Sequence, residues 1–172
     1  MTVTVRPACP DDAAGVLAVV EDAFSYGGAR DAGEELAIVR GTWSARNGHT
    51  LIELVADDAG AVVGHLLAAL GSLDGHASPV AGVAPVCVGA ADQGRGVGSA
   101  LVLALLGSAE ERRWPLLVLL GDPAFYARFG FEPAAPLGLN YPPVGADNPH
   151  FQARRLPGYT AALRGEFGYC WE

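Results

Sequence analysis

Apolar positions at the start of the chain alternate first and then recur at helical spacing. Val3 and Val5 alternate up to Pro7, which predicts a short first strand. Pro10-Asp11-Asp12 predicts a helix start, because proline fits the first turn and carboxylates favour the positive end of the helix dipole. One apolar stripe then follows at helical spacing, made of Ala13, Val16, Leu17, Val20 and Phe24. A shorter helical pattern covers residues 34–39.

The middle of the chain has the pattern of strands. Residues 51–55 and 61–70 are apolar runs joined by the turn sequence of residues 57–60, which predicts a β-hairpin. A third long strand is expected over residues 80–88. Pro85 lies inside it and predicts an interrupted ladder, because proline cannot donate a hydrogen bond to a neighbouring strand.

Helical spacing returns afterwards. It covers residues 97–112 and stops at Trp114-Pro115. Residues 115–120 are almost all apolar, which is typical of a short buried strand, and residues 124–129 predict a short helix. The five prolines within residues 133–149 indicate a long surface connection, and two closing strands are expected over residues 151–156 and 165–171. The order of elements predicts a mixed α/β or α+β fold.

Composition narrows the classes of protein that remain. The chain has 172 residues, 51% of them hydrophobic, which fits one domain with a substantial core. All 11 positive charges are arginine and the formal net charge is -8, so no basic stripe indicates a nucleic-acid partner. Neither a spanning helix nor a signal peptide is expected. The cysteines, Cys9, Cys87 and Cys170, are too scattered to predict a metal site or a disulfide framework, which favours a cytoplasmic protein.

The most informative segment runs from Val86 to Val102. A strand leads into a glycine-rich turn and the turn leads into a helix, which predicts a cradle for a phosphate-bearing ligand. Small residues let the backbone approach the ligand, and Arg95 adds a positive charge beside it. A P-loop is excluded because the chain has no lysine. A Rossmann fingerprint fits poorly, because Ser99 stands at the third glycine position and no βαβ unit opens the chain.

A third alternative fits better. Gln93-x-x-Gly96-x-Gly98 resembles the acetyl-CoA loop of the GNAT N-acetyltransferase superfamily. Residues 119–131 resemble the family's second motif, a strand and short helix that end in Y-x-x-x-G-F. Their sequence is similar to that of a bacterial branch of predicted acetyltransferases within the family. The resemblance covers roughly residues 2–135. It implies a twisted, mostly antiparallel sheet with helices on both faces, splayed between its fourth and fifth strands. Residues 1–140 would form the acetyltransferase domain, and residues 141–172 an extension that completes it.

The resemblance also implies roles for individual residues. Val86, Cys87 and Val88 would pair with the pantetheine arm of acetyl-CoA, and a backbone N–H near Val88 would polarise the thioester carbonyl. Tyr126 would protonate the departing thiolate, and Asp122 stands where many members of the family carry a cofactor-binding asparagine. The remaining cofactor-binding residues would be those of the turn and the first helical turn: Gln93, Gly94, Arg95, Gly96, Val97, Gly98 and Ser99.

The predicted function is transfer of an acetyl group from acetyl-CoA directly to a primary amine, on a small-molecule acceptor that the sequence does not identify. The alternative is an acetyl-CoA-binding sensor without catalysis, because the strand over residues 80–88 lacks the glutamate that many family members place there. The general base stays open among Glu34, Glu35, His65, Asp74 and His76. The sequence does not decide whether the protein is a monomer or a homodimer. Packing explains Cys87 as a small buried strand residue, and a histidine on an apolar strand, such as His65, is more often a core residue than a base.

Overall fold

The computed structural model describes residues 3–25, 31–44, 51–145 and 147–171. Helices and strands follow one another in the order that the hydrophobic pattern predicts, with two further two-residue strands within residues 132–140, and the fold is mixed α/β. The helices are α1 (Ala13–Ser25), α2 (Gly33–Ser44), α3 (Val97–Glu111) and α4 (Pro123–Tyr126). The strands are β1 (Thr4–Pro7), β2 (Leu51–Asp58), β3 (Ala61–Leu73), β4 (His76–Val88), β5 (Leu116–Leu120), β6 (Glu132–Pro133), β7 (Leu139–Asn140), β8 (Phe151–Arg155) and β9 (Gly165–Gly168).

The chain forms two compact units, and β3 and β4 each contribute residues to both. The first unit contains Met1–Ala68 and Ala84–Gly107, and the second contains Ala69–Val83 and Ser108–Glu172. Residues 61–68 of β3 and 84–88 of β4 thus belong to the first unit, and residues 69–73 and 76–83 of the same strands belong to the second.

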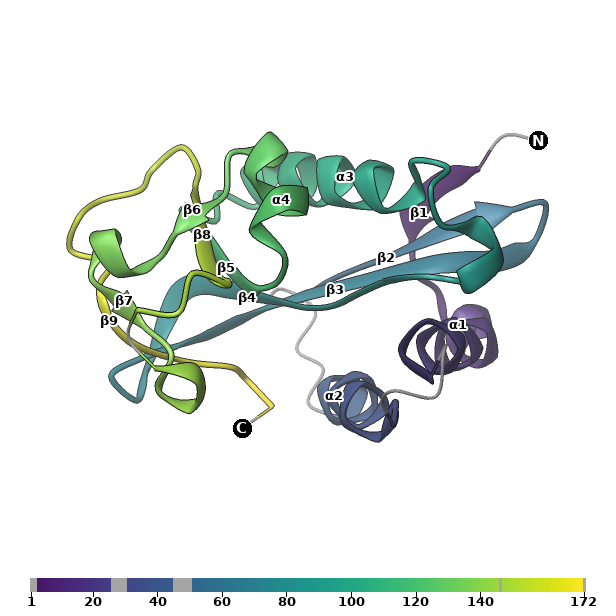
Figure 1. Cartoon of the computed structure of the whole chain (residues 1–172), viewed down its shortest axis with the longest axis horizontal. Coiled ribbons are helices and arrows are strands. Elements are labelled where there is room, and N and C mark those ends of the chain that lie inside the picture. Colours follow the sequence, from purple (N-terminus) through teal and green to yellow (C-terminus); the bar gives the residue numbers. More distant parts are fainter. Residues whose placement is uncertain (1–2, 26–30, 45–50, 146, 172) are drawn as a thin grey trace. The chain divides into compact units, whose positions relative to one another are not determined.

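In the first unit, helices cover both faces of the strands. The strand order is β1-β2-β3-β4, and β1 pairs antiparallel with β2. Helices α1 and α2 lie on one face and α3 lies on the other (Figure 1). The core under α1 and α2 consists of Val16, Val19, Val20, Val39, Val55 and Cys87. On the other face, Val97 and Leu101 of α3 pack over Gly64 of β3, where a Cβ would lie 3.1 Å from both side chains. The expectation of helices on both faces is thus confirmed.

Helix α2 is longer than the sequence pattern predicts. The apolar spacing ends at Val39, but the helix continues to Ser44. Thr42 is buried and its hydroxyl donates a hydrogen bond to the carbonyl oxygen of Ile38 at 2.8 Å, so its polar atom is satisfied within the helix. The helix therefore extends beyond the last residue of the apolar pattern, with a threonine on its buried face.

An ion network fixes the start of α1 to the first two strands. Asp12, 8% exposed, receives two hydrogen bonds from the guanidinium of Arg6, at 2.7 and 2.8 Å, and one from the backbone N–H of Cys9 at 2.8 Å. Arg6 also pairs with Asp57 of β2 at 2.8 Å. The Arg6 hydrogen bonds, together with that of the Cys9 N–H, hold the pKa of Asp12 well below its usual range. The ionised carboxylate therefore stabilises the folded chain.

We expect the substitution Asp12→Asn to lower the melting temperature at pH 7 by roughly 3–6 °C, since it removes the charge from a buried, charge-assisted pair. Because the folded pKa of Asp12 is depressed, its stabilising effect is present above the unfolded pKa and is lost as the pH falls toward the folded value. The difference between variant and wild type should therefore shrink below about pH 4. Thermal melts at pH 7 and pH 3 measure it, with the exposed neighbour Asp11→Asn as control. A difference that is the same at both pH values would contradict the argument.

The second unit is built on strand β5. Residues Leu116–Leu119 pair in parallel with Val80–Val83 of β4, and the other edge of β5 pairs antiparallel with β8. The register with β4 ends at Val83, two residues before Pro85, in agreement with the expected interruption of the ladder. Strand β6 adds to β8, while β9 pairs with β3 and β7. The sheet is thus mixed, with a parallel pair at its fourth and fifth strands.

The prolines in residues 133–149 do not make this segment a surface connection throughout. Ala134 is 0% exposed and Leu139 is 1% exposed. Leu139 starts the short strand β7, which pairs in parallel with β9 in the register Leu139↔Gly165. The expectation of a surface connection is wrong for these residues, because single apolar residues between prolines can fill core positions that no periodicity shows.

Candidate active site

The glycine-rich turn, residues 89–96, joins β4 to α3 and exposes backbone N–H groups. The N–H of Ala100 donates to the carbonyl oxygen of Gly96 at 3.0 Å, which is the first bond of α3. The N–H groups that precede it, those of Val97, Gly98 and Ser99, have no acceptor inside the helix, because the first turn of a helix never provides one. They form the positive end of the helix dipole, which favours an anionic ligand.

Two glycines give the turn its shape. Gly94 has φ = +74° and Gly96 has φ = +84°, a region that side chains with a Cβ rarely adopt. A Cβ built on either glycine meets nothing within 4 Å. The backbone is therefore open to close approach by a ligand, and the residues fit the pyrophosphate of a coenzyme.

Hydrogen bonds from neighbouring elements hold the turn in place. The N–H of Gly89 donates to Val63 of β3 at 3.0 Å, and the N–H of Ala90 donates to the carboxylate of Asp22 on α1 at 2.7 Å. The side-chain amide of Gln93 donates to the carbonyl oxygen of Val88 at 3.3 Å. Gln93 thus ties the turn to the end of β4, which gives a structural reason for a glutamine at the start of the motif.

The charge of Arg95 is already engaged by carboxylates. Its guanidinium donates a hydrogen bond to Asp92 and lies 3.7 Å from a carboxylate oxygen of Asp58. Positive potential at the turn therefore comes chiefly from the first-turn N–H groups of α3, rather than from a free arginine side chain as the sequence suggests.

The second motif places Tyr126 on the short helix α4. The carboxylate of Asp122 caps this helix by accepting a hydrogen bond from the N–H of Ala124 at 2.9 Å. The Tyr126 ring packs against Phe131, with ring centroids 5.6 Å apart, and lies over Gly121, where a Cβ would be 2.4 Å from the ring. Glycine at position 121 is thus required for the ring to occupy its place. Capping of α4 explains Asp122 without a ligand.

Burial raises the pKa of Tyr126 to about 12. The phenol therefore keeps its proton through the neutral range, as a proton donor must. Burial likewise raises the pKa of the Cys87 thiol to about 12. Cys87 is 5% exposed and belongs to the core of the first unit, so its side chain acts in packing.

The candidate bases occupy different environments. Glu34 and Glu35 lie in the first turn of α2, the former exposed and the latter half-buried. Asp74 accepts a hydrogen bond from the N–H of Glu166 at 2.8 Å and so holds β9, and His76 is exposed at the start of β4. His65 is fully buried on β3, with its Nε2 3.0 Å from a carboxylate oxygen of Glu53.

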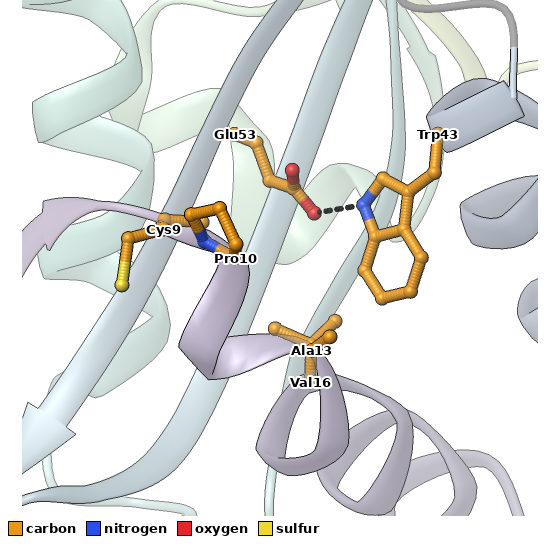
Figure 2. A pocket seen from close by; sticks show the side chains of 7 residues that line it. Cys9, Pro10, Ala13, Val16, Trp43 and Glu53 are labelled. Atoms are coloured by element: carbon orange, nitrogen blue, oxygen red, sulfur yellow. Dashed lines mark hydrogen bonds between the residues drawn. The ribbon is translucent and has the colours of Figure 1, made fainter.

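Sequence reasoning missed Glu53, which lines a pocket in the first unit (Figure 2). Its side chain is 6% exposed, and its Oε1 also accepts a hydrogen bond from the indole N–H of Trp43 at 2.7 Å. The signal was the one carboxylate within the apolar run of residues 51–56, which begins β2. Among the residues that the structure describes, no group of His, Cys, Asp and Glu side chains is arranged to hold a metal ion, and no helix is long and apolar enough to span a membrane.

Comparisons with known proteins give a consistent result. The family model described as an acetyltransferase (GNAT) domain matches residues 4–134. The uncharacterized N-acetyltransferase YhbS of Escherichia coli K12 is 33% identical over 165 residues, which cover 95% of this chain and 92% of the relative. The crystal structure of E. coli YhbS in complex with CoA superposes with a TM-score of 0.84 at 30% identity, covering 97% of this chain and 89% of that one. A GNAT family acetyltransferase from Brucella melitensis in complex with acetyl-CoA gives 0.78 at 28% identity, covering 98% and 96%.

Proposed function

This chain belongs to the GNAT acetyltransferase family, and from that premise we propose that it transfers an acetyl group from acetyl-CoA directly to a primary amine on a small acceptor molecule. The observation that carries the proposal is the glycine-rich turn, in which two positive-φ glycines precede the free N–H groups of α3. Two related structures contain CoA and acetyl-CoA, which supports acetyl-CoA as the cosubstrate.

The residues of the first unit would bind the cosubstrate. The N–H groups of residues 94–99 would donate to the pyrophosphate, where small side chains leave the backbone accessible. The backbone of Val86, Cys87 and Val88 would pair with the pantetheine arm. An N–H near Val88 would stabilise negative charge that develops on the thioester oxygen. Acetyl-CoA supplies the activated acetyl group, whose thioester is a better electrophile than an amide.

Tyr126 would act as the general acid. As the amine nitrogen bonds to the acetyl carbon and the carbon–sulfur bond breaks, the phenol gives a proton to the sulfur. The proton that leaves the amine nitrogen balances the one that the sulfur gains, so the reaction yields an amide and free CoA thiol. A pKa of about 12 keeps the phenol protonated before each turnover.

Calorimetric titration tests the cosubstrate. We expect acetyl-CoA and CoA to bind with dissociation constants below about 1 mM, the upper end of the usual range of KM values. We expect that NAD neither binds nor competes with CoA, because the turn lacks the dinucleotide-binding fingerprint. Absence of acetyl-CoA binding at millimolar concentration would overturn the proposal. Binding without release of CoA thiol in the presence of any amine would instead identify an acetyl-CoA-binding sensor.

A further inference from the structure

Two side chains of the second unit donate hydrogen bonds to the carbonyl oxygen of Gly121, the residue that follows β5. The ring nitrogen Nδ1 of His150 lies 3.1 Å from this oxygen, and the side-chain amide of Gln152 donates to it at 3.0 Å. In the other direction, the N–H of Gly121 donates to the carbonyl oxygen of His150 at 2.9 Å. Gln152 is 1% exposed, whereas His150 is exposed. The imidazole of His150 is therefore held at one nitrogen on the surface of the unit.

The contact with Gly121 fixes which ring nitrogen of His150 carries the proton. A carbonyl oxygen can only accept, so Nδ1 of the neutral imidazole is the donor. The lone pair is then on Nε2, because a neutral imidazole has one donor nitrogen and one acceptor nitrogen. Among the residues that the structure describes, none forms a hydrogen bond with Nε2. His150 thus presents an acceptor nitrogen to solvent, as a general base must.

His150 and Tyr126 lie on the same face of the second unit. The antiparallel register between β5 and β8 includes Leu120↔Phe151, so the next pair along the strands is Gly121 and His150. Opposite residues of an antiparallel pair project to the same face, with Cβ atoms about 4.5–5.5 Å apart. A Cβ on Gly121 would lie 2.4 Å from the Tyr126 ring. The Cβ of His150 is therefore within about 8 Å of that ring.

We propose that His150 is the general base of acetyl transfer, with Nε2 taking the proton from the amine nitrogen. The inference rests on the proposed acetyl transfer and adds a catalytic residue to it. Amine nitrogen, acetyl carbon and sulfur are joined in one tetrahedral intermediate, so the acid and the base that serve it must lie close together. Tyr126 is the proposed acid, and Gly121 is the common neighbour of Tyr126 and His150.

The proton transfers balance over one turnover. As the nitrogen of a neutral amine bonds to the acetyl carbon, it gives one proton to Nε2 of His150. As the carbon–sulfur bond breaks, Tyr126 gives its phenolic proton to the sulfur. The imidazolium then releases its proton to water and the phenolate takes one from water, so the products are an amide and CoA thiol. The exposed position of His150 provides the contact with water that this exchange needs.

The other two candidate bases of the second unit, Asp74 and His76, fit this role less well. Asp74 holds the N–H of Glu166 at 2.8 Å and so serves the attachment of β9. His76 begins β4, and β4 pairs in parallel with β5 in the register Val80↔Leu116 to Val83↔Leu119. His76 therefore lies toward the start of β5, whereas Tyr126 packs over Gly121 at the end of β5.

Steady-state kinetics of His150→Asn tests the proposal. The acceptors are 2-phenylethylamine, putrescine and glycinamide, with release of CoA thiol as the readout. The asparagine amide nitrogen takes the place of Nδ1 and can still donate to Gly121, but nothing replaces Nε2. We expect kcat/KM for an acetylated amine to fall about a hundredfold, the lower end of what a general base contributes, with the acetyl-CoA dissociation constant and the melting temperature unchanged. Asp147→Asn, at an exposed position of the same loop, is the matched control and should behave as wild type.

Chemical rescue separates proton transfer from a structural role. His150→Ala should lose activity like His150→Asn, and added imidazole should restore kcat at least fivefold. Pyrazole has the same ring shape but is almost non-basic, so it should not restore kcat. Tyr126→Phe lacks the acid rather than the base and should not respond to imidazole.

Nitrogen NMR of the histidine-labelled wild type tests the protonation of the ring without any acceptor, with His150→Asn assigning the signal. The expected result is a proton on Nδ1. The proposal is overturned if the neutral ring carries its proton on Nε2, if His150→Asn keeps wild-type kcat/KM, or if pyrazole rescues His150→Ala as well as imidazole does. If none of the three amines is acetylated, the NMR result alone decides. All of these results concern His150 only, whereas the proposed function fails if calorimetry shows no acetyl-CoA binding.

Discussion

The substitution Gly96→Val is expected to weaken acetyl-CoA binding by at least a hundredfold, which corresponds to about 2.7 kcal/mol. Gly96 has φ = +84° and its carbonyl oxygen accepts the first hydrogen bond of α3. A valine there would either leave this backbone region or project its branched side chain over the N–H groups that we expect to hold the pyrophosphate. Calorimetric titration with acetyl-CoA measures the loss.

Gly158→Val is the matched control for this experiment. Gly158 has φ = +92°, and a Cβ on it also meets nothing within 4 Å, but it lies after β8 and outside the glycine-rich turn. Both variants carry a backbone strain of about 1–2 kcal/mol, so both should melt at a lower temperature than wild type. Only Gly96→Val should lose the ligand. Equal acetyl-CoA affinity of the two variants would show that the turn does not bind the cosubstrate.

Tyr126→Phe should lower kcat by at least tenfold and leave the dissociation constant of acetyl-CoA unchanged. The substitution removes the phenolic proton but keeps the ring that packs against Phe131 and over Gly121. A tenfold loss corresponds to about 1.4 kcal/mol in the activation barrier, which is modest for removal of a general acid. Release of CoA thiol with an accepted amine measures kcat.

The control for this variant is Tyr159→Phe, which removes a hydroxyl from a tyrosine whose ring lies 5.8 Å from the guanidinium of Arg155 and which has no expected role in catalysis. The pH profile gives an independent check. Because burial raises the pKa of Tyr126 to about 12, its ionisation should not reduce kcat of the wild type below about pH 11. Unchanged kcat in Tyr126→Phe would refute the role of general acid.

The glycine-rich turn and the second motif could be found from the sequence because each is a local feature. A positive-φ glycine, a helix start and a capping aspartate all depend on residues within a few positions of one another. The glycine-rich turn and the short helix with Tyr126 therefore appear in the structure where the sequence places them. The role of Arg95 could not be assessed in the same way, because one of its partners, Asp58, is on the distant strand β2.

The pocket could not be predicted, because it joins residues that are far apart in the chain. Glu53 lies on β2, His65 on β3 and Trp43 on a part of α2 beyond the predicted helix. In the sequence, His65 is more readily explained as a core residue than as a base, and Glu53 is the one charge within the apolar run of residues 51–56. Only the contact between His65 and Glu53 in the folded chain shows that the two residues belong to the same site.

The sequence by itself determined the alternation of helices and strands, the glycine-rich turn, the capped helix that carries Tyr126 and the family to which the chain belongs, since these depend on local backbone preference and the spacing of apolar residues. Tertiary structure alone decided which carboxylate lies in a pocket, which arginine is already paired, and where a proline-rich segment is buried. These properties depend on long-range packing, which brings a buried charge and its partners together and which no local pattern records.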